Sequence, residues 1–174
     1  MKSLNAFQLC MKVLRVLVIV VTVLMAALTI FFGISLAVWM TFDEISFVYR
    51  SDFYQFILHY TDIGTYYYNI SYFTSKLAFS LINTTLLVFL INLLNHEIRT
   101  GNPSNEECVS LTKWMGIRCF VFPSIALAFS TFIFFYFNQT LPYYFIDFSY
   151  IVYGIIFILA SLLLKHGCKD NEEE

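Results

Sequence analysis

Charged residues divide the chain into four long uncharged intervals, and this spacing constrains the fold more than any other feature of the sequence. The intervals hold 27 residues between Arg15 and Asp43, 19 between Lys76 and His96, 28 between Arg118 and Asp147, and 17 between Asp147 and Lys165. An ionised side chain at the centre of a bilayer costs about 2.5 kcal/mol or more, and about 20 helical residues cross the hydrocarbon core. Each interval therefore predicts one membrane helix. We expect an all-α integral membrane protein, a four-helix bundle with spans near 14–40, 74–95, 115–137 and 143–165.

The composition agrees with a membrane location. Only 13% of the 174 residues are charged, about half the share of an ordinary soluble domain, and 59% are hydrophobic. Ten basic residues are matched by twelve acidic ones and form no cluster that would neutralise a nucleic-acid backbone. No repeat or low-complexity linker interrupts the sequence, so we expect a single membrane domain over 1–174 in contact with the lipid bilayer.

The distribution of lysine and arginine predicts the orientation. Eight of the ten basic residues lie at the N-terminus, in the connection over 96–114 with Arg118 just beyond it, and at the C-terminus, and the other two are Arg50 and Lys76. Because basic residues mark the cytoplasmic side, we expect both termini in the cytoplasm and the segment 41–73 outside the plasma membrane. The first apolar stretch is longer than that of a cleaved signal peptide, so we expect a retained anchor.

The outer segment 41–73 is aromatic rather than polar. Tyr49, Phe53 and Phe56 recur at helical spacing, with Ile45 and Tyr60 on the same face. An interfacial helix on the outer leaflet fits this pattern, and a loop packed over the bundle fits it equally well. In either form, Tyr49, Phe53 and Phe56 are a candidate partner surface.

The inner connection carries clear signals for the end of one helix and the start of the next. Gly101 and Pro103 end the second helix. Ser104 and Glu107 form a capping box, which predicts a cytoplasmic helix that begins at about Asn105 and runs through Trp114 into the third span. We expect Trp114 and Met115 to be exposed on this helix, where they could contact a partner. Anchoring at the bilayer surface explains Trp114 as well.

Small residues mark the helix faces that we expect to form the bundle interior, because helices in lipid pack through small side chains. They are Thr22, Ala26, Thr29, Gly33 and Ala37 in the first span, Ser124, Ala128 and Thr131 in the third, and Gly154 and Ser161 in the fourth.

The second span carries the most polar stripe of the chain. Lys76, Ser80, Asn83 and Thr84 follow one another at helical spacing, and Asp147 is the expected ionic partner of Lys76 at the outer interface. Such a line could border a hydrated cavity open to the outside. The simpler interpretation is that Lys76 extends to the headgroups while the amide and hydroxyls bond to neighbouring helices, and we favour this one.

The residues that carry catalysis or bind metals form no recognisable pattern. Cys10, Cys108, Cys119 and Cys168 contain no C-x-x-C pair and all fall on the expected cytoplasmic side, where thiols stay reduced. The three histidines, His59, His96 and His166, have no further ligands at metal-binding spacing. No phosphate-binding loop or nucleophile motif is present. We therefore expect no cofactor, no metal and no enzymatic activity.

The stretch from Leu94 to Ile117 and the C-terminal end resemble a bacterial family of four-helix membrane proteins known as domain of unknown function 2975. The corresponding residues are Gly101-Asn102-Pro103-Ser104, then Leu111 to Gly116-Ile117, and finally Gly167 with Asp170 to Glu174. Ser104 stands where an aromatic residue is usual in that family. The resemblance implies the four-span topology and a bacterial plasma membrane, and it implies no catalytic residues.

Three functions remain open at this point. The favoured one is a non-enzymatic membrane protein that acts by contact, as an accessory subunit, an immunity protein or an envelope-stress sensor. The alternative is a small transport or channel subunit that forms a homo-oligomer and depends on Lys76, Asn83 and Asp147. The third is a membrane enzyme acting on lipid or peptide, with His59 and either Asp52 or Asp62 as its acid-base pair.

Overall fold

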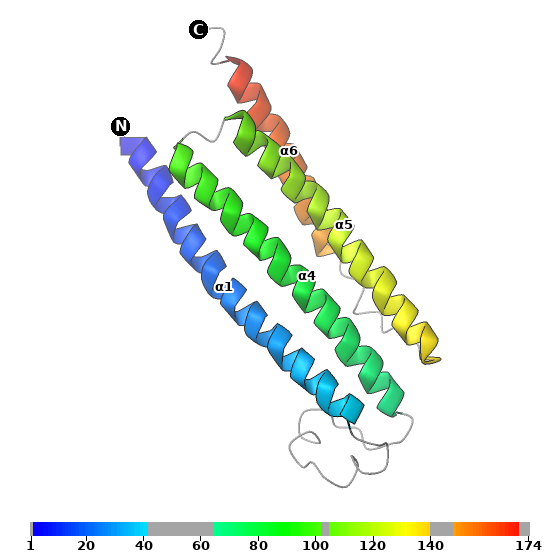
Figure 1. The fold of residues 1–174 in the computed structure, drawn as a ribbon. Coiled ribbons are helices and arrows are strands. Elements are labelled where there is room, and N and C mark those ends of the chain that lie inside the picture. Colours follow the sequence, from blue (N-terminus) through cyan, green and yellow to red (C-terminus); the bar gives the residue numbers. More distant parts are fainter. Residues whose placement is uncertain (1, 42–64, 102–104, 140–147, 171–174) are drawn as a thin grey trace. The chain divides into compact units, whose positions relative to one another are not determined.

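The described part of the chain is all-helical. The computed structural model describes residues 2–41, 65–101, 105–139 and 148–170. Within these ranges it contains α1 (Lys2–Thr41), α4 (Thr65–Thr100), α5 (Glu106–Tyr136) and α6 (Ser149–Asp170), and no strand (Figure 1). The stretches Gln8–Val38, Tyr66–Thr100 and Glu106–Tyr136 are long and apolar enough to cross a membrane, and the apolar part of α6, Ser149–Lys165, is shorter. The expectation of an all-α chain with membrane-compatible helices is confirmed.

Helices of the described chain extend beyond the predicted spans. α1 begins at Lys2 rather than near 14. α4 begins at Thr65, so the last part of the predicted outer segment 41–73 is helical. Its first turn is held by aromatic contacts: Tyr67 stacks on Phe137, and Tyr68 meets Phe134 edge to face. α6 runs from Ser149 to Asp170, past the predicted end at 165, and the predicted start near 143 lies outside the described residues. The Phe148 carbonyl accepts the N–H groups of Ile151 and Val152 in the first turn of α6.

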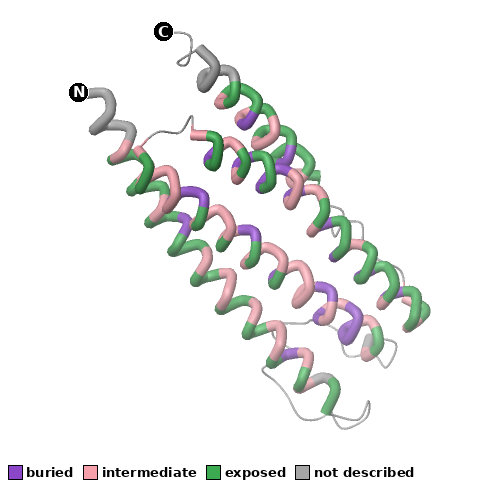
Figure 2. Tube along the Cα trace, turned by 45° about the horizontal axis from the view of Figure 1, so that its top comes forward, coloured by how far each residue is buried: buried purple, intermediate pink, exposed green. Residues whose placement is uncertain are grey.

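The chain divides into two compact units. Unit 1 comprises Met1–Met25, Ile82–Ser124 and Asp147–Glu174, and unit 2 comprises Ala26–Leu81 and Ile125–Ile146. Helices α1, α4 and α5 are each divided between the units, with one part in unit 1 and the other part in unit 2. Of these three helices, α1 is the least buried by the rest of the protein. In its most apolar stretch 6% of the residues are buried, against 22% in α4 and 28% in α5 (Figure 2).

The core of unit 1 joins α4, α5 and α6. Leu86, Met115 and Cys119 form its buried centre, and the half-buried residues packed against them are Ile82, Phe89, Leu90, Phe122, Tyr150 and Phe157. α5 and α6 approach closely at Gly116 and Gly154. A Cβ atom on Gly116 would lie 2.9 Å from the Gly154 carbonyl oxygen, and one on Gly154 would lie 2.6 Å from the Phe120 ring. Only glycine fits at these two positions without a shift of the helices.

The core of unit 2 is aromatic. Ile70 and Phe73 of α4 are its buried centre, and the residues packed against them are Phe32, Leu36, Tyr66, Tyr72 and Phe137. The Thr29 and Ser80 hydroxyls are hydrogen-bonded 2.6 Å apart and so join α1 to α4 within this unit. Gly33 faces Leu77 at the looser distance of 3.9 Å.

The small-residue prediction is right for α6 and wrong for α5. Gly154 and Ser161 are buried as expected. Ser124, Ala128 and Thr131 are exposed, and the two hydroxyls bond to the carbonyls of Phe120 and Leu127 in their own helix. A hydroxyl that bonds back to its own helix needs no neighbour, so small size alone did not identify the packed face. The buried positions of α5 beyond Pro123 are Ala126, Ser130 and Phe134.

The turn between α4 and α5 follows the predicted signals. Gly101 adopts a positive φ of 64° and donates its N–H to the Glu97 carbonyl at 3.0 Å, which ends α4. α5 begins at Glu106, and the Asn105 side-chain oxygen accepts the Glu107 N–H at 3.4 Å. Asn105 thus caps the helix start, whereas the predicted cap, Ser104, lies outside the described residues.

Candidate functional site

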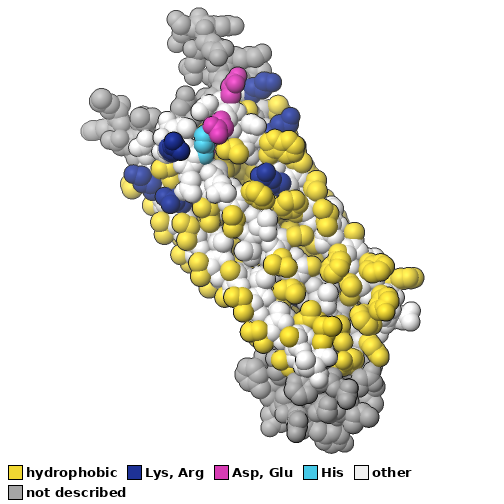
Figure 3. Space-filling view, in the orientation of Figure 1, with side chains coloured by type: hydrophobic (Ala, Val, Ile, Leu, Met, Phe, Trp, Pro, Cys, Tyr) yellow, Lys and Arg dark blue, Asp and Glu magenta, His cyan; other side chains and the backbone are white. Residues whose placement is uncertain are grey.

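Unit 1 holds most of the charge of the chain. Three basic residues in Met1–Met25, three in Ile82–Ser124 and two in Asp147–Glu174 make eight of the ten. On the face drawn in Figure 3, the charged and histidine side chains of this unit gather toward the end that carries the start of α1. His96 Nε2 of α4 lies 3.4 Å from Glu107 Oε2 of α5 there, and the two form an ion pair when the imidazole is protonated.

The predicted polar stripe of α4 is divided between the units. Lys76 and Ser80 belong to unit 2, and Asn83 and Thr84 belong to unit 1. Lys76 is half-buried, with its Nζ 5.4 Å from the centroid of the Tyr72 ring, so an aromatic face stabilises its charge. Ser80 is buried in its bond with Thr29.

In unit 1 the stripe residue Asn83 is hydrogen-bonded to a residue of another helix. Tyr150 Oη of α6 donates to Asn83 Oδ1 of α4 at 2.5 Å, and Thr84 is half-buried beside it in sequence. The partner Tyr150 lies 67 residues away and was missed, since no sequence signal specifies which aromatic of α6 faces α4.

Several predicted site residues lie outside the described residues, so their predictions stand as they were made. They are Asp147 of the polar stripe, the outer aromatic residues Tyr49, Phe53 and Phe56, and the acid-base candidates Asp52, His59 and Asp62.

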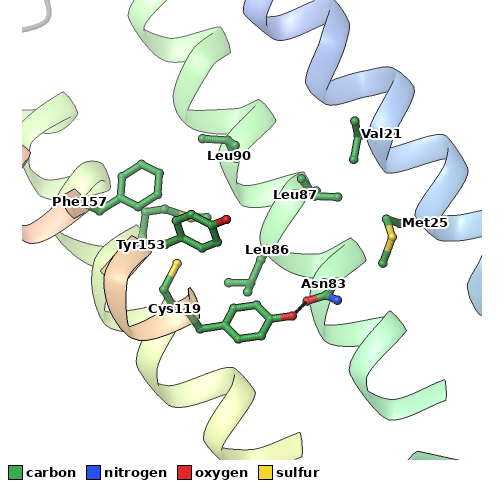
Figure 4. A pocket seen from close by; sticks show the side chains of 11 residues that line it. Val21, Met25, Asn83, Leu86, Leu87, Leu90, Cys119, Tyr153 and Phe157 are labelled. Carbon is green, nitrogen blue, oxygen red and sulfur yellow. Dashed lines mark hydrogen bonds between the residues drawn. The ribbon is translucent and has the colours of Figure 1, made fainter. Parts of the chain in front are cut away.

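Unit 1 contains a cavity of about 410 Å³ next to the Asn83–Tyr150 pair (Figure 4). Its lining is almost wholly apolar and draws on all four helices: Val21, Met25, Asn83, Leu86, Leu87, Leu90, Met115, Cys119, Tyr150, Tyr153 and Phe157. Val21 and Met25 lie on one side of α4, and Cys119, Tyr153 and Phe157 on the other. Its volume falls within the range of roughly 300–1,000 Å³ that is typical of small-molecule sites.

Unit 2 contains buried polar atoms of another kind. Four of them have no hydrogen-bond partner: Ser35 Oγ, Asn69 Nδ2, Ser75 Oγ and Ser130 Oγ. These four residues are at most 4% exposed and come from α1, α4 and α5. An unpaired buried polar group lowers the stability of a fold by about 1–3 kcal/mol, so these four atoms lower the stability of unit 2.

The two candidate partner residues at the start of α5 differ in exposure. Trp114 is 52% exposed, in agreement with its predicted role at a surface. Met115 is 5% exposed and packs with Leu86 and Cys119, so the prediction that it is exposed is wrong. Consecutive residues of a helix point about 100° apart, and the α5 face that carries Met115 is the one covered by α4 and α6.

Reactive residues are sparse in the part of the chain that the structure describes. Cys10 is exposed, Cys108 and Cys119 are buried, and all three are free thiols. No group of three His, Cys, Asp or Glu side chains able to hold a metal ion occurs among the described residues.

No family model, no curated protein and no solved structure matches the chain.

Proposed function

We propose that the chain is a four-span membrane protein, with both termini in the cytoplasm, that acts by contact with another membrane protein and not by catalysis. The roles that fit are an accessory subunit, an immunity protein or an envelope-stress sensor. Membership of the bacterial four-helix family named above, and with it a plasma-membrane location, belongs to the same proposal. Three long apolar helices support the membrane location. α6 would serve as the fourth span together with the residues from 143 that precede it.

The distribution of basic residues supports the orientation. Unit 1, with eight of the ten, would carry the cytoplasmic side, and the outer side would carry Arg50 and Lys76. Reporter fusions after Thr100, Gln139 and Asp170 test this. Fluorescent protein should be bright at Thr100 and Asp170, and alkaline phosphatase should be active only at Gln139. Phosphatase activity at Asp170 would contradict the four-span topology.

The observation that carries the contact function is the exposed Trp114 at the start of α5. Ser110, Lys113, Trp114 and Val121 are exposed and share one face of the helix, while Met115 and Cys119 fix the opposite face in the core. Tryptophan is one of the residue types most enriched in interface hot spots, and here it is half-exposed on a firmly held helix. The occupant that fits this face is a membrane protein with an apolar pocket and an acidic group near the cytoplasmic boundary.

Crosslinking in native membranes at natural expression, followed by capture in mild detergent, tests this function. We expect one foreign membrane protein in stoichiometric amount, and we expect Trp114→Ala to reduce its recovery at least fivefold. Phe135→Ala removes another exposed aromatic of α5 and is the matched control. Equal recovery with Trp114→Ala and Phe135→Ala would contradict a contact through Trp114.

A second candidate function, a small oligomeric transport or channel subunit, is favoured by the unpaired polar atoms of unit 2. Ser35, Asn69, Ser75 and Ser130 would then face water in a path that several copies complete. This function predicts that capture yields only the chain itself, as a defined oligomer, and that changes at Lys76, Asn83 or Asp147 impair flux.

A further inference from the structure

The cavity of unit 1 presents the Asn83 amide to a ligand, and the Tyr153 hydroxyl and the Cys119 thiol also line it. Asn83 Oδ1 already accepts the Tyr150 hydroxyl, whereas no acceptor is recorded for the Asn83 Nδ2 amide among the described residues. In Figure 4 a dashed line marks the hydrogen bond at the Asn83 oxygen, whose donor is Tyr150, and the Asn83 nitrogen is turned to the side of Met25. The cavity therefore presents a hydrogen-bond donor within an apolar lining.

The depth of Asn83 limits what can accept that bond. Asn83 lies thirteen residues before His96 on α4, about 20 Å along the helix from the charged end of unit 1. If α4 spans the bilayer, bulk water does not reach this level, and an acceptor has to enter with a molecule that dissolves in hydrocarbon.

The lining indicates the shape and charge of that molecule. Tyr150, Tyr153 and Phe157 follow one face of α6 and line the cavity with three aromatic rings, which favours a flat ring as ligand. The lining holds no Asp, Glu, Lys, Arg or His, so a charged molecule would be left unpaired there.

We propose that this cavity binds a neutral, membrane-soluble ring compound with a carbonyl oxygen, the chemical class of the lipid quinones, and that Asn83 Nδ2 donates to the carbonyl. The inference goes beyond the contact function and rests only on the part of the proposal that sets α4 in the bilayer. Binding alone is proposed, with no redox step.

Two probes that differ only in their carbonyl groups test the proposal on the full chain in phosphatidylcholine nanodiscs. Duroquinone is a fully substituted quinone, so it has no free ring position for addition of the Cys119 thiol. Durene carries the same four methyl groups on a flat benzene ring, with C–H in place of each carbonyl. Equilibrium dialysis, with empty nanodiscs subtracted, should give saturable duroquinone binding at one molecule per chain. We expect durene to bind about tenfold more weakly, as the loss of one hydrogen bond requires.

Variants locate the site. Asn83→Leu should weaken duroquinone binding about tenfold, whereas Asn92→Leu, at an exposed position of the same helix, should leave it unchanged. Leu87→Trp fills the cavity and should abolish binding, whereas Val88→Trp adds the same bulk on the exposed side and should not.

Three results would overturn the proposal: no saturable binding, equal affinity for durene and duroquinone, or displacement of duroquinone by equimolar methyl palmitate, which would identify the cavity as a lipid acyl site. The probe comparison uses the unaltered chain and so stays decisive if a variant fails to fold. A failure of the four-span topology would appear in the reporter fusions instead.

Discussion

The two units differ in which buried side-chain atoms of the described residues lack a hydrogen-bond partner: in unit 1 they are Arg15 Nε and His96 Nε2, and in unit 2 they are the atoms of four uncharged side chains. In unit 1 the Asn83 oxygen and the Tyr150 hydroxyl are bonded to each other beside an apolar cavity, and the helices approach closely at Gly116 and Gly154. In unit 2 aromatic rings fill the core, and the hydroxyls of Ser35, Ser75 and Ser130 have no partner. Where water is scarce, glycine lets helices approach without leaving a polar atom unpaired, whereas serine allows a close approach at that cost.

The largest expected effect tests the tight packing of unit 1. Gly116→Ala would set a Cβ atom 2.7 Å from Ile158 Cγ1 and 2.9 Å from the Gly154 carbonyl, so α5 and α6 would have to separate. We expect a loss of about 1–3 kcal/mol in the free energy of unfolding. Thermal unfolding in mild detergent, followed by circular dichroism, measures it.

Gly33→Ala is the matched control in unit 2, where the new Cβ atom would lie at an ordinary 3.9 Å from Leu77. We expect no loss of stability. If Gly33→Ala and Gly116→Ala cost the same, the contrast in packing between the units is wrong.

The next effect concerns the bonded pair of unit 1. Tyr150→Phe removes the donor to Asn83 and leaves an amide oxygen unpaired, so we expect a loss of about 1–2 kcal/mol. Tyr153→Phe, on the same helix, is the control. The double variant Asn83→Leu with Tyr150→Phe should recover part of the loss, because both polar groups are then absent. A double variant less stable than Tyr150→Phe alone would argue that the pair is not the source of the effect.

The serine hydroxyls of unit 2 that have no partner should respond with the opposite sign. Ser130→Ala removes a buried hydroxyl without a partner, so we expect stability to rise by up to about 1 kcal/mol. Ser80→Ala breaks the bond to Thr29 and should lower stability by about 0.5–1 kcal/mol. Destabilisation by Ser130→Ala would indicate that water or a ligand occupies unit 2, and it would favour the transport function.

The smallest effect is expected at the ion pair of unit 1. Glu107 is 67% exposed in its side chain, so the Glu107→Gln change should cost no more than about 0.5 kcal/mol and should depend on salt concentration. A loss above 1 kcal/mol, measured in the same unfolding assay, would show that the α4–α5 turn depends on this pair.

Much of the fold could be predicted from the sequence because its signals are local. The uncharged intervals predicted the helices, and Gly101 and Asn105 marked the end of α4 and the start of α5 to within a residue. The helix faces were harder to predict. The small residues Ser124 and Thr131 satisfy their own hydroxyls and are exposed, while Met115 is buried because of the helices beside it.

The candidate site could be predicted only in part. Its members on α4, Asn83 and Ser80, were visible as a polar stripe, but their partners Tyr150 and Thr29 come from other helices. The cavity also depends on all four helices together, and no single segment carries a signal for it.

The most direct test of the account is a photo-crosslinking amino acid introduced at position 114 in native membranes, with position 17 on exposed α1 as the comparison. The contact function predicts one discrete protein adduct from position 114 and only lipid adducts from position 17. Lipid adducts alone at position 114 would show that Trp114 anchors α5 to the bilayer, and they would contradict the proposed contact.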